Sequence, residues 1–199
     1  MKYPDNISAV AACHPDYMGF IFYDKTKRYV GEELDDKIVN ALNPEIKKVG
    51  VFVNHSNSYI ESKIQKYGLS LIQLHGDETI EQCKELKSKG YTIIKVFQAD
   101  QNFDFSVIGP FKKYVDYFLF DTKSEGYGGS GKKFDWNIFK RYDNEIPLFL
   151  SGGLDLESIE EIKKLTYLNI HALDINSKFE VEAGRKDVDL IKEFIKLIK

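Results

Sequence analysis

The chain has 199 residues, of which 43% are hydrophobic and 30% are charged, and its formal net charge is −3. This length and hydrophobic content suit one domain over residues 1–199, and the scattered lysines, with 28 basic against 31 acidic residues, argue against a nucleic-acid partner. No apolar run is long enough to span a membrane and the N-terminus lacks a signal-peptide core, so we expect a cytoplasmic protein.

The chain opens on a predicted helix, because Pro4 stands at a helix start and Ile7, Val10 and Ala11 recur at helical spacing. Seven short runs rich in β-branched and aromatic residues follow. Each run is almost continuously apolar, which is typical of strands buried on both faces of a parallel sheet. The runs cover residues 18–22, 48–54, 69–76, 91–98, 117–121, 146–153 and 171–177.

Charged segments of helical period separate these runs, and two of them, residues 56–68 and 78–90, close on glycines suited to a helix C-terminus, Gly68 and Gly90. The alternation of strands and helices predicts an α/β fold, and we expect a (β/α)8 TIM barrel that lacks its first β-strand, because only seven strands are found. A doubly wound open sheet is the competing architecture. It would normally show a glycine-rich turn after its first strand, and the sequence has none there.

Polar residues close most of the runs, at the strand ends where barrels carry their sites. Asp121 ends the fifth run, directly before a loop with four glycines, Gly126, Gly128, Gly129 and Gly131. If that loop closes as a lid, it shields the carboxyl group from water and lets it donate a proton near neutral pH. The alternative interpretation is an aspartate that only caps the following turn.

Two other strand ends favour the binding of an anionic ligand. Gly152 and Gly153 close the sixth run and Ser177 closes the seventh, which together predict a phosphate site built from backbone N–H groups and a short helix. Arg28 follows the first run and can meet a carboxylate with a planar pair of donors. His75 and Gln73 are two residues apart on one strand, so their side chains point to the same side of the sheet. If one points into the barrel mouth, the other lies beneath it. The default interpretation is a core histidine whose hydrogen bonds are made within the core.

The two cysteines, Cys13 and Cys83, suit neither a disulfide framework nor a zinc site, and we expect a reducing compartment. No pair of histidines or carboxylates has metal-ligand spacing.

These motifs resemble, in this order, one known family. MGFIFYDKTKRYV, VGVFVN, IQLHGDE, KVFQ, FDTKSEGYGGSGKKFDW, FLSGGL and DINSKFEVEAGRKD are similar to segments of phosphoribosylanthranilate isomerase, and the likeness spans nearly the whole chain. The resemblance implies a (β/α)8 barrel that converts N-(5-phosphoribosyl)anthranilate into the corresponding aminoketose in tryptophan biosynthesis. It also implies no metal or organic cofactor, a small phosphorylated substrate, and a monomer or homodimer.

The resemblance also implies roles for individual residues. Asp121 matches the general acid that protonates the furanose ring oxygen, and Arg28 matches the arginine that meets the anthranilate carboxylate. Gly152, Gly153 and Ser177 match the phosphate site, while His75 and Asp174 fall in the substrate pocket. One departure is Lys178 after Ser177, where family members often have a Ser-Gly pair, so the phosphate contacts there are expected to differ.

A second departure is at the start, because family members begin with a strand of the type K-[IV]-C-G whose cysteine is the general base. The sequence starts where that motif ends, so we expect the base to be absent, with a rate lowered roughly 10²- to 10⁴-fold. We also expect lower stability and association at the open edges.

Two other hypotheses stay open. A phosphosugar-binding pseudoenzyme fits the absent base, but the retention of Asp121, Arg28 and the phosphate elements argues against it. An indoleglycerol-phosphate synthase or a ribulose-phosphate epimerase would need a lysine-centred site or metal-binding histidines and aspartates, and neither set is apparent.

Overall fold

Among the residues that the structure describes, seven strands form a parallel sheet at the centre of the molecule. The computed structural model describes residues 1–31, 34–122 and 135–198. The strands follow one another in the order β1 to β7, which confirms the predicted α/β fold and the seven predicted runs. Their bounds are β1 (Tyr17–Ile21), β2 (Lys47–Phe52), β3 (Leu71–Leu74), β4 (Thr92–Ala99), β5 (Tyr117–Thr122), β6 (Leu148–Leu150) and β7 (Ile170–Leu173).

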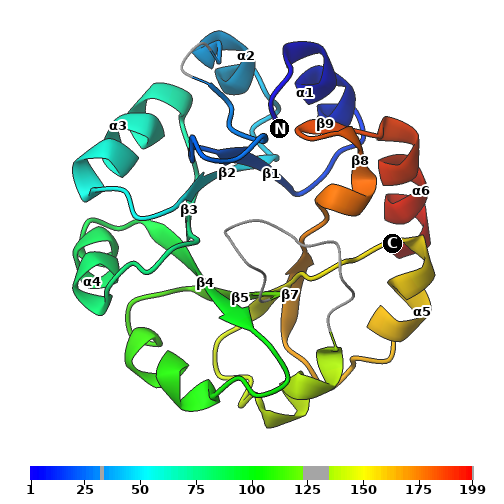
Figure 1. The fold of residues 1–199 in the computed structure, drawn as a ribbon. Helices are drawn as coiled ribbons and strands as arrows, with labels where there is room; N and C mark the ends of the chain where they lie inside the picture. The colour runs from blue at the N-terminus through cyan, green and yellow to red at the C-terminus, as the bar shows by residue number, and fades with distance from the viewer. Residues whose placement is uncertain (32–33, 123–134, 199) are drawn as a thin grey trace.

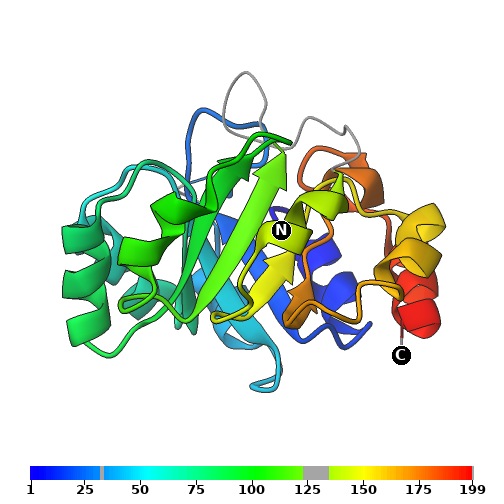
Figure 2. The same cartoon turned by 90° about the horizontal axis from the view of Figure 1, so that it is seen from below.

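Helices surround the sheet on its outer side, as the view along the barrel axis shows (Figure 1). Seen from the side, the strands run in the same direction, so their carboxyl ends meet at one edge of the molecule (Figure 2). The helices are α1 (Pro4–Ala11), α2 (Asp36–Asn40), α3 (Asn57–Tyr67), α4 (Ile80–Ser88), α5 (Ile159–Ile162) and α6 (Val188–Ile198).

Apolar side chains fill both faces of the sheet, which explains the nearly continuous apolar runs. A small inner cluster inside the curled sheet consists of Val49, Leu71, Ile94, Val96, Leu119 and Phe149. The neighbouring side chains of the same strands point outward, and Phe20, Phe52 and Phe118 pack there in the larger cluster beneath the helices.

Local signals in the sequence set the helix ends. The side chains of Ser56 and Thr79 accept hydrogen bonds from backbone N–H groups of the first turns of α3 and α4. At the other ends, Gly68 and Gly90 have φ angles of 58° and 86°, a left-handed conformation that glycine adopts without strain. The two predicted C-terminal glycines are therefore confirmed.

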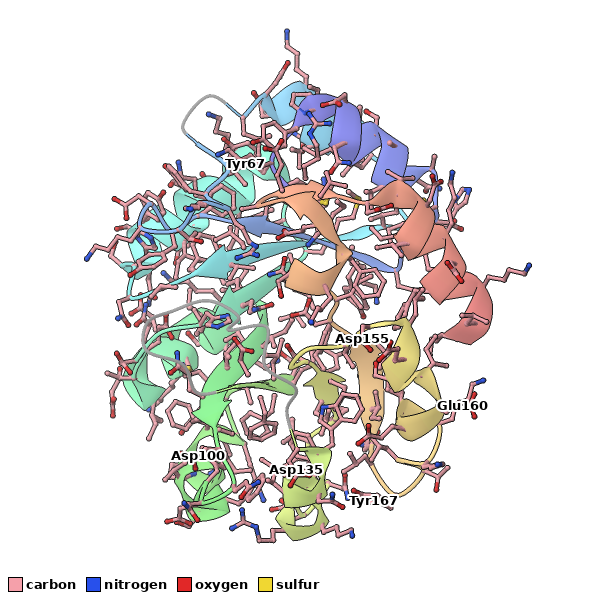
Figure 3. The ribbon with its side chains drawn as sticks, turned by 45° about the vertical axis from the view of Figure 1, so that its right-hand side comes forward. Tyr67, Asp100, Asp135, Asp155, Glu160 and Tyr167 are labelled. Atoms are coloured by element: carbon pink, nitrogen blue, oxygen red, sulfur yellow. The ribbon has the colours of Figure 1, made fainter. Side chains whose placement is uncertain are left out.

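Several elements depart from the predicted pattern. Within the described ranges there are four short 3-10 segments, η1 (Phe105–Phe111), η2 (Trp136–Arg141), η3 (Leu156–Ser158) and η4 (Ser177–Phe179), and a hairpin joins β8 (Glu180–Glu182) to β9 (Arg185–Lys186). Asp135 and Asp155, labelled in Figure 3, cap η2 and η3 with their side chains. Such 3-10 segments of three to seven residues are too short to produce a recognisable helical period.

Candidate functional site

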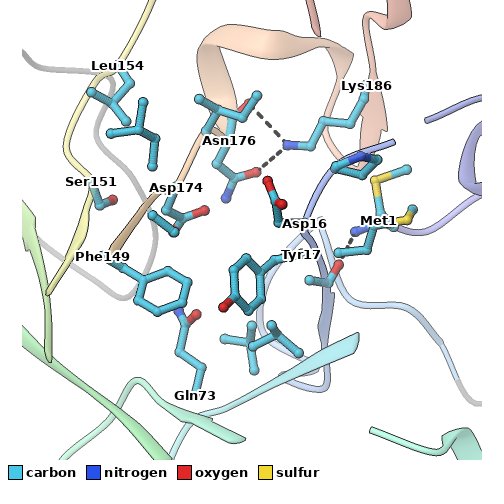
Figure 4. Close-up of a pocket in the computed structure, with 18 of the residues that line it drawn as sticks. Met1, Asp16, Tyr17, Gln73, Phe149, Ser151, Leu154, Asp174, Asn176 and Lys186 are labelled. Carbon is cyan, nitrogen blue, oxygen red and sulfur yellow. Dashed lines mark hydrogen bonds between the residues drawn. The ribbon is translucent and has the colours of Figure 1, made fainter. Parts of the chain in front are cut away.

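A cavity of about 690 Å³ extends from the barrel interior to the carboxyl ends of the strands. Every residue proposed for the site from the sequence lines it, and Figure 4 shows how several of its walls face one another. These residues are Arg28, His75, Asp121, Gly152, Gly153, Asp174 and Ser177. Side chains and backbone from five different strand ends are thus brought to one space, as expected for this fold.

His75 and Asp121 face each other across the mouth of the cavity. His75 Nε2 lies 3.5 Å from Asp121 Oδ2, and Asp121 is 8% exposed. On the other side of the imidazole ring, Gln73 Nε2 lies 3.1 Å from His75 Nδ1. If the glutamine donates there, the ring proton sits on Nε2 and points toward the carboxylate. Gln73 and His75 both line the cavity, in agreement with their shared strand parity.

A buried ion pair holds the loop that carries His75. Lys95 Nζ donates to Glu78 Oε2 at 2.9 Å and to the carbonyl oxygen of Gly76 at 2.7 Å. The Glu78 carboxylate in turn accepts hydrogen bonds from the backbone N–H groups of Gly76 and Asn54. With nearly all of both side chains buried, this network fixes the path of the chain directly after β3.

Asp174 is a second carboxyl group in the cavity, directly after β7. Burial raises its pKa, and the charge of Asp121 acts in the same direction, while Lys186 opposes both. A carboxyl group with a raised pKa keeps its proton to higher pH and can donate a hydrogen bond to a ligand hydroxyl.

Arg28 is held by a residue from the hairpin at the far end of the chain. Its Nε and Nη2 atoms donate to Glu180 Oε2 at 2.9 and 2.7 Å. Glu180 Oε1 also accepts from Lys186 Nζ at 3.0 Å and from the N–H of Gly184 at 3.2 Å. About a fifth of the Arg28 side chain stays exposed, so the fork fixes the guanidinium while part of it still faces the cavity.

The backbone of the predicted phosphate site has only part of the expected conformation. Gly152 and Gly153 have φ angles of 96° and 75°, which explains why glycine is needed at both positions. Ser177 begins η4, which is one short 3-10 turn rather than a helix with a substantial dipole. Lys186 Nζ donates to the carbonyl and side-chain oxygens of Asn176 at 3.1 and 2.6 Å and so fixes this turn.

Sequence reasoning missed the roles of Glu180 and Lys186, although both belong to the segment DINSKFEVEAGRKD, on which the family resemblance partly rests. The motif is visible in the sequence, but its function of anchoring Arg28 and the η4 turn depends on contacts between distant segments. The glycine-rich loop, with Gly126, Gly128, Gly129 and Gly131, lies outside the described residues, and its role as a lid stays a prediction.

Cys13 and Cys83 do not line the cavity. Burial raises the pKa of both thiols, that of Cys83 to about 11. Among the residues that the structure describes, no group of three His, Cys, Asp or Glu side chains could hold a metal ion. No helix within the same ranges is long and apolar enough to cross a membrane.

Comparisons with known proteins agree with this geometry. A family model described as N-(5'-phosphoribosyl)anthranilate isomerase matches residues 3–197. A protein of that name from Parabacteroides distasonis is 43% identical over the whole chain, which covers 90% of the relative. The crystal structure of phosphoribosyl anthranilate isomerase from Thermotoga maritima is 33% identical, with a TM-score of 0.87, over 100% of this chain and 95% of the other.

A further structure of such an isomerase, 30% identical with a TM-score of 0.84, covers 100% of this chain and 94% of the other. It was determined in complex with reduced 1-(o-carboxyphenylamino)-1-deoxyribulose 5-phosphate. Another, 27% identical with a TM-score of 0.80, over 100% of this chain and 94% of the other, is described as generated monomers of a dimeric isomerase from Thermotoga maritima. These likenesses confirm the predicted TIM-barrel fold.

Proposed function

Because the chain belongs to the N-(5'-phosphoribosyl)anthranilate isomerase family, we propose that the cavity described above is its active site and that Asp121 is the general acid. The reaction is the isomerisation of N-(5'-phosphoribosyl)anthranilate to an aminoketose in tryptophan biosynthesis. The observation that carries the proposal is the buried Asp121 carboxyl group at the end of β5, facing His75 inside the cavity.

The chemistry needs a proton donor at the furanose ring oxygen, because ring opening leaves negative charge on that atom. Asp121 lies among groups that can hold the sugar around it. His75, with a proton on Nε2, would donate to the Asp121 carboxylate after proton transfer and stabilise its charge. Asp174, whose pKa is raised by burial, would form a hydrogen bond with a ribose hydroxyl group.

The two anionic ends of the substrate fit opposite parts of the cavity. Arg28, oriented by Glu180, would meet the anthranilate carboxylate. The backbone at Gly152, Gly153 and Ser177 would bind the phosphate through N–H groups, since its glycines leave room for close approach. The ligand is thus a small phosphorylated molecule, with no cofactor required, and we expect a monomer or homodimer of one domain in the cytoplasm.

The test is turnover of N-(5'-phosphoribosyl)anthranilate, made in place from anthranilate and phosphoribosyl pyrophosphate, and followed by loss of substrate fluorescence. We expect conversion by the chain, and an Arg28→Lys variant with a raised KM, because lysine cannot form the planar fork. Binding of the reduced product analogue without any turnover would replace the proposal with a phosphosugar-binding role. If neither binding nor turnover is found, the cavity is not the active site.

A further inference from the structure

The imidazole ring of His75 has a buried nitrogen that makes no hydrogen bond within the described residues. This atom, Nε2, faces the Asp121 carboxylate at 3.5 Å. At its other nitrogen, Nδ1, the ring meets the side chain of Gln73, which points from β3 into the cavity (Figure 4). Leaving a buried polar atom without a partner costs free energy. The ring therefore keeps this position only because the structure around it holds it there.

Two buried charged side chains hold the backbone on both sides of His75. Lys95 Nζ donates to the carbonyl oxygen of Leu74 at 3.3 Å and to that of Gly76 at 2.7 Å. The Glu78 carboxylate accepts from the N–H of Gly76, with its two oxygens 3.1 and 2.9 Å from the nitrogen. Hydrogen bonds to charged groups are stronger than those between neutral groups. The peptide groups that carry the ring therefore cannot shift without losing several strong contacts.

The loop after β2 is fixed to the same carboxylate. The N–H of Asn54 donates to Glu78 Oε1 at 2.9 Å, and the side-chain oxygen of Asn54 accepts from the N–H of Asp77 at 2.7 Å. Asn54 has a φ angle of 54°, which is uncommon for a residue other than glycine. A Cβ atom at Gly76 would lie 2.4 Å from Asn54 Oδ1. The loops after β2 and β3 are thus in close contact, and a shift of one displaces the other.

Stability alone does not explain why two charges occupy this place. Only 3% of the Lys95 side chain and none of the Glu78 side chain is exposed, and the cost of removing such charges from water offsets their attraction. Apolar side chains of similar volume would stabilise the fold as well or better. They could not, however, bind the backbone groups on both sides of His75. Neither Glu78 nor Lys95 lines the cavity, so any effect on the chemistry passes through the residues that they hold.

We propose that Glu78 and Lys95 are positioning residues for the isomerase reaction, because they hold the His75 ring against Asp121. This inference rests on the proposed function, in which His75 Nε2 stabilises the Asp121 carboxylate after proton transfer. The separation of 3.5 Å shortens to a hydrogen bond at that moment, and a ring that already faces the carboxylate needs little rearrangement. A displaced ring slows the chemical step but leaves both anionic ends of the substrate in place, so the KM changes little.

The test is the double variant Glu78→Gln/Lys95→Met, which removes both charges at similar side-chain volume and should keep the fold. Its single-turnover rate on N-(5'-phosphoribosyl)anthranilate should fall about 10- to 100-fold. In a His75→Ala background, the same two substitutions should lower the rate less than about twofold, because the effects of residues that act through one group are not additive. The matched control is Glu61→Gln/Lys89→Met, which changes a more exposed ion pair between α3 and the end of α4 and should leave the rate unchanged.

The NMR signals of the His75 ring nitrogens give a second readout, which needs no turnover. They should shift in Glu78→Gln/Lys95→Met and stay unchanged in the control. If the double variant does not fold, Gly76→Ala replaces it, because its methyl group displaces Asn54 and moves the same loop. Equal rate losses with and without His75, or unchanged ring signals in the variant, would overturn the proposal. A wild-type chain without turnover would instead refute the proposed function, and the ring signals would still decide whether the pair positions His75.

Discussion

Arg28 and Glu180 lie 152 positions apart in the chain, and Nε and Nη2 of the arginine both donate to one oxygen of the glutamate. This contact joins the loop after β1 to the hairpin after β7. Because Lys186 and the N–H of Gly184 bind the other oxygen, the carboxylate organises the mouth of the cavity. Removing its charge should therefore affect both stability and substrate binding.

Glu180→Gln should lower the free energy of unfolding by about 1.5–3 kcal/mol, since hydrogen bonds to a charged group are lost in a nearly buried position. Denaturant unfolding measures this difference. Glu182→Gln is the matched control in the same hairpin, because its ion pair with Arg185 is largely exposed and should contribute well under about 1 kcal/mol. Equal losses in the two variants would contradict the role assigned to Glu180.

The same carboxyl group predicts a pH dependence of stability. Burial alone would raise the pKa of Glu180, but the hydrogen bond from Arg28 and the charge of Lys186 more than offset it, so the pKa is below its ordinary value of 4.5. A depressed pKa stabilises the fold above the unfolded-state value and loses that contribution as the pH falls. The stability difference between the wild type and Glu180→Gln should be constant from pH 7 to about 5.5 and shrink below pH 4.5. A difference that stays unchanged down to pH 3 would rule this out.

Gly152→Ala and Gly153→Ala should each cost about 1–2 kcal/mol of stability, because both positions have a positive φ angle. If these glycines contact the phosphate, the KM for substrate should rise as well. Gly90→Ala is the control, with a φ angle of 86° at the end of α4 and no atom close to its Cβ position. It should show the same loss of stability with an unchanged KM. A raised KM in Gly90→Ala, or an unchanged KM in Gly152→Ala and Gly153→Ala, would show that this loop does not bind the phosphate.

Gln73→Leu should reduce kcat about tenfold or more, because His75 loses the partner that orients its ring and fixes its proton. Steady-state kinetics measures the effect. Gln82→Leu makes the same change in α4, where the side chain bonds the carbonyl of His55, and it should leave kcat unchanged. A Gln73→Leu variant with normal kcat would show that the ring needs no such support.

The positions of the strand-end residues could be predicted because strands buried on both faces produce apolar runs that are visible in one sequence. Asp121, His75 and Gly152 each lie at the end of such a run, and a parallel barrel brings all strand ends to one edge. The predicted membership of the isomerase family is confirmed as well.

The contacts that hold the site residues in place could not be predicted in the same way. The pairing of Glu180 with Arg28 depends on how the chain returns to its start, and local patterns carry no information on that. The hairpin from β8 to β9 consists mainly of charged residues and has neither the alternation nor the apolar content of a typical strand. Its order comes from contacts with other segments, such as the two hydrogen bonds between the Asn6 side chain and the backbone of Lys186.

The most direct test of the account is the single-turnover rate of Asp121→Asn on N-(5'-phosphoribosyl)anthranilate, compared with the wild type at pH 7. Asparagine keeps the shape of the side chain but cannot transfer a proton, so the rate should fall roughly 10²- to 10⁴-fold, while the reduced product analogue still binds. A variant that binds the analogue and keeps the wild-type rate would contradict the assignment of Asp121 as the general acid.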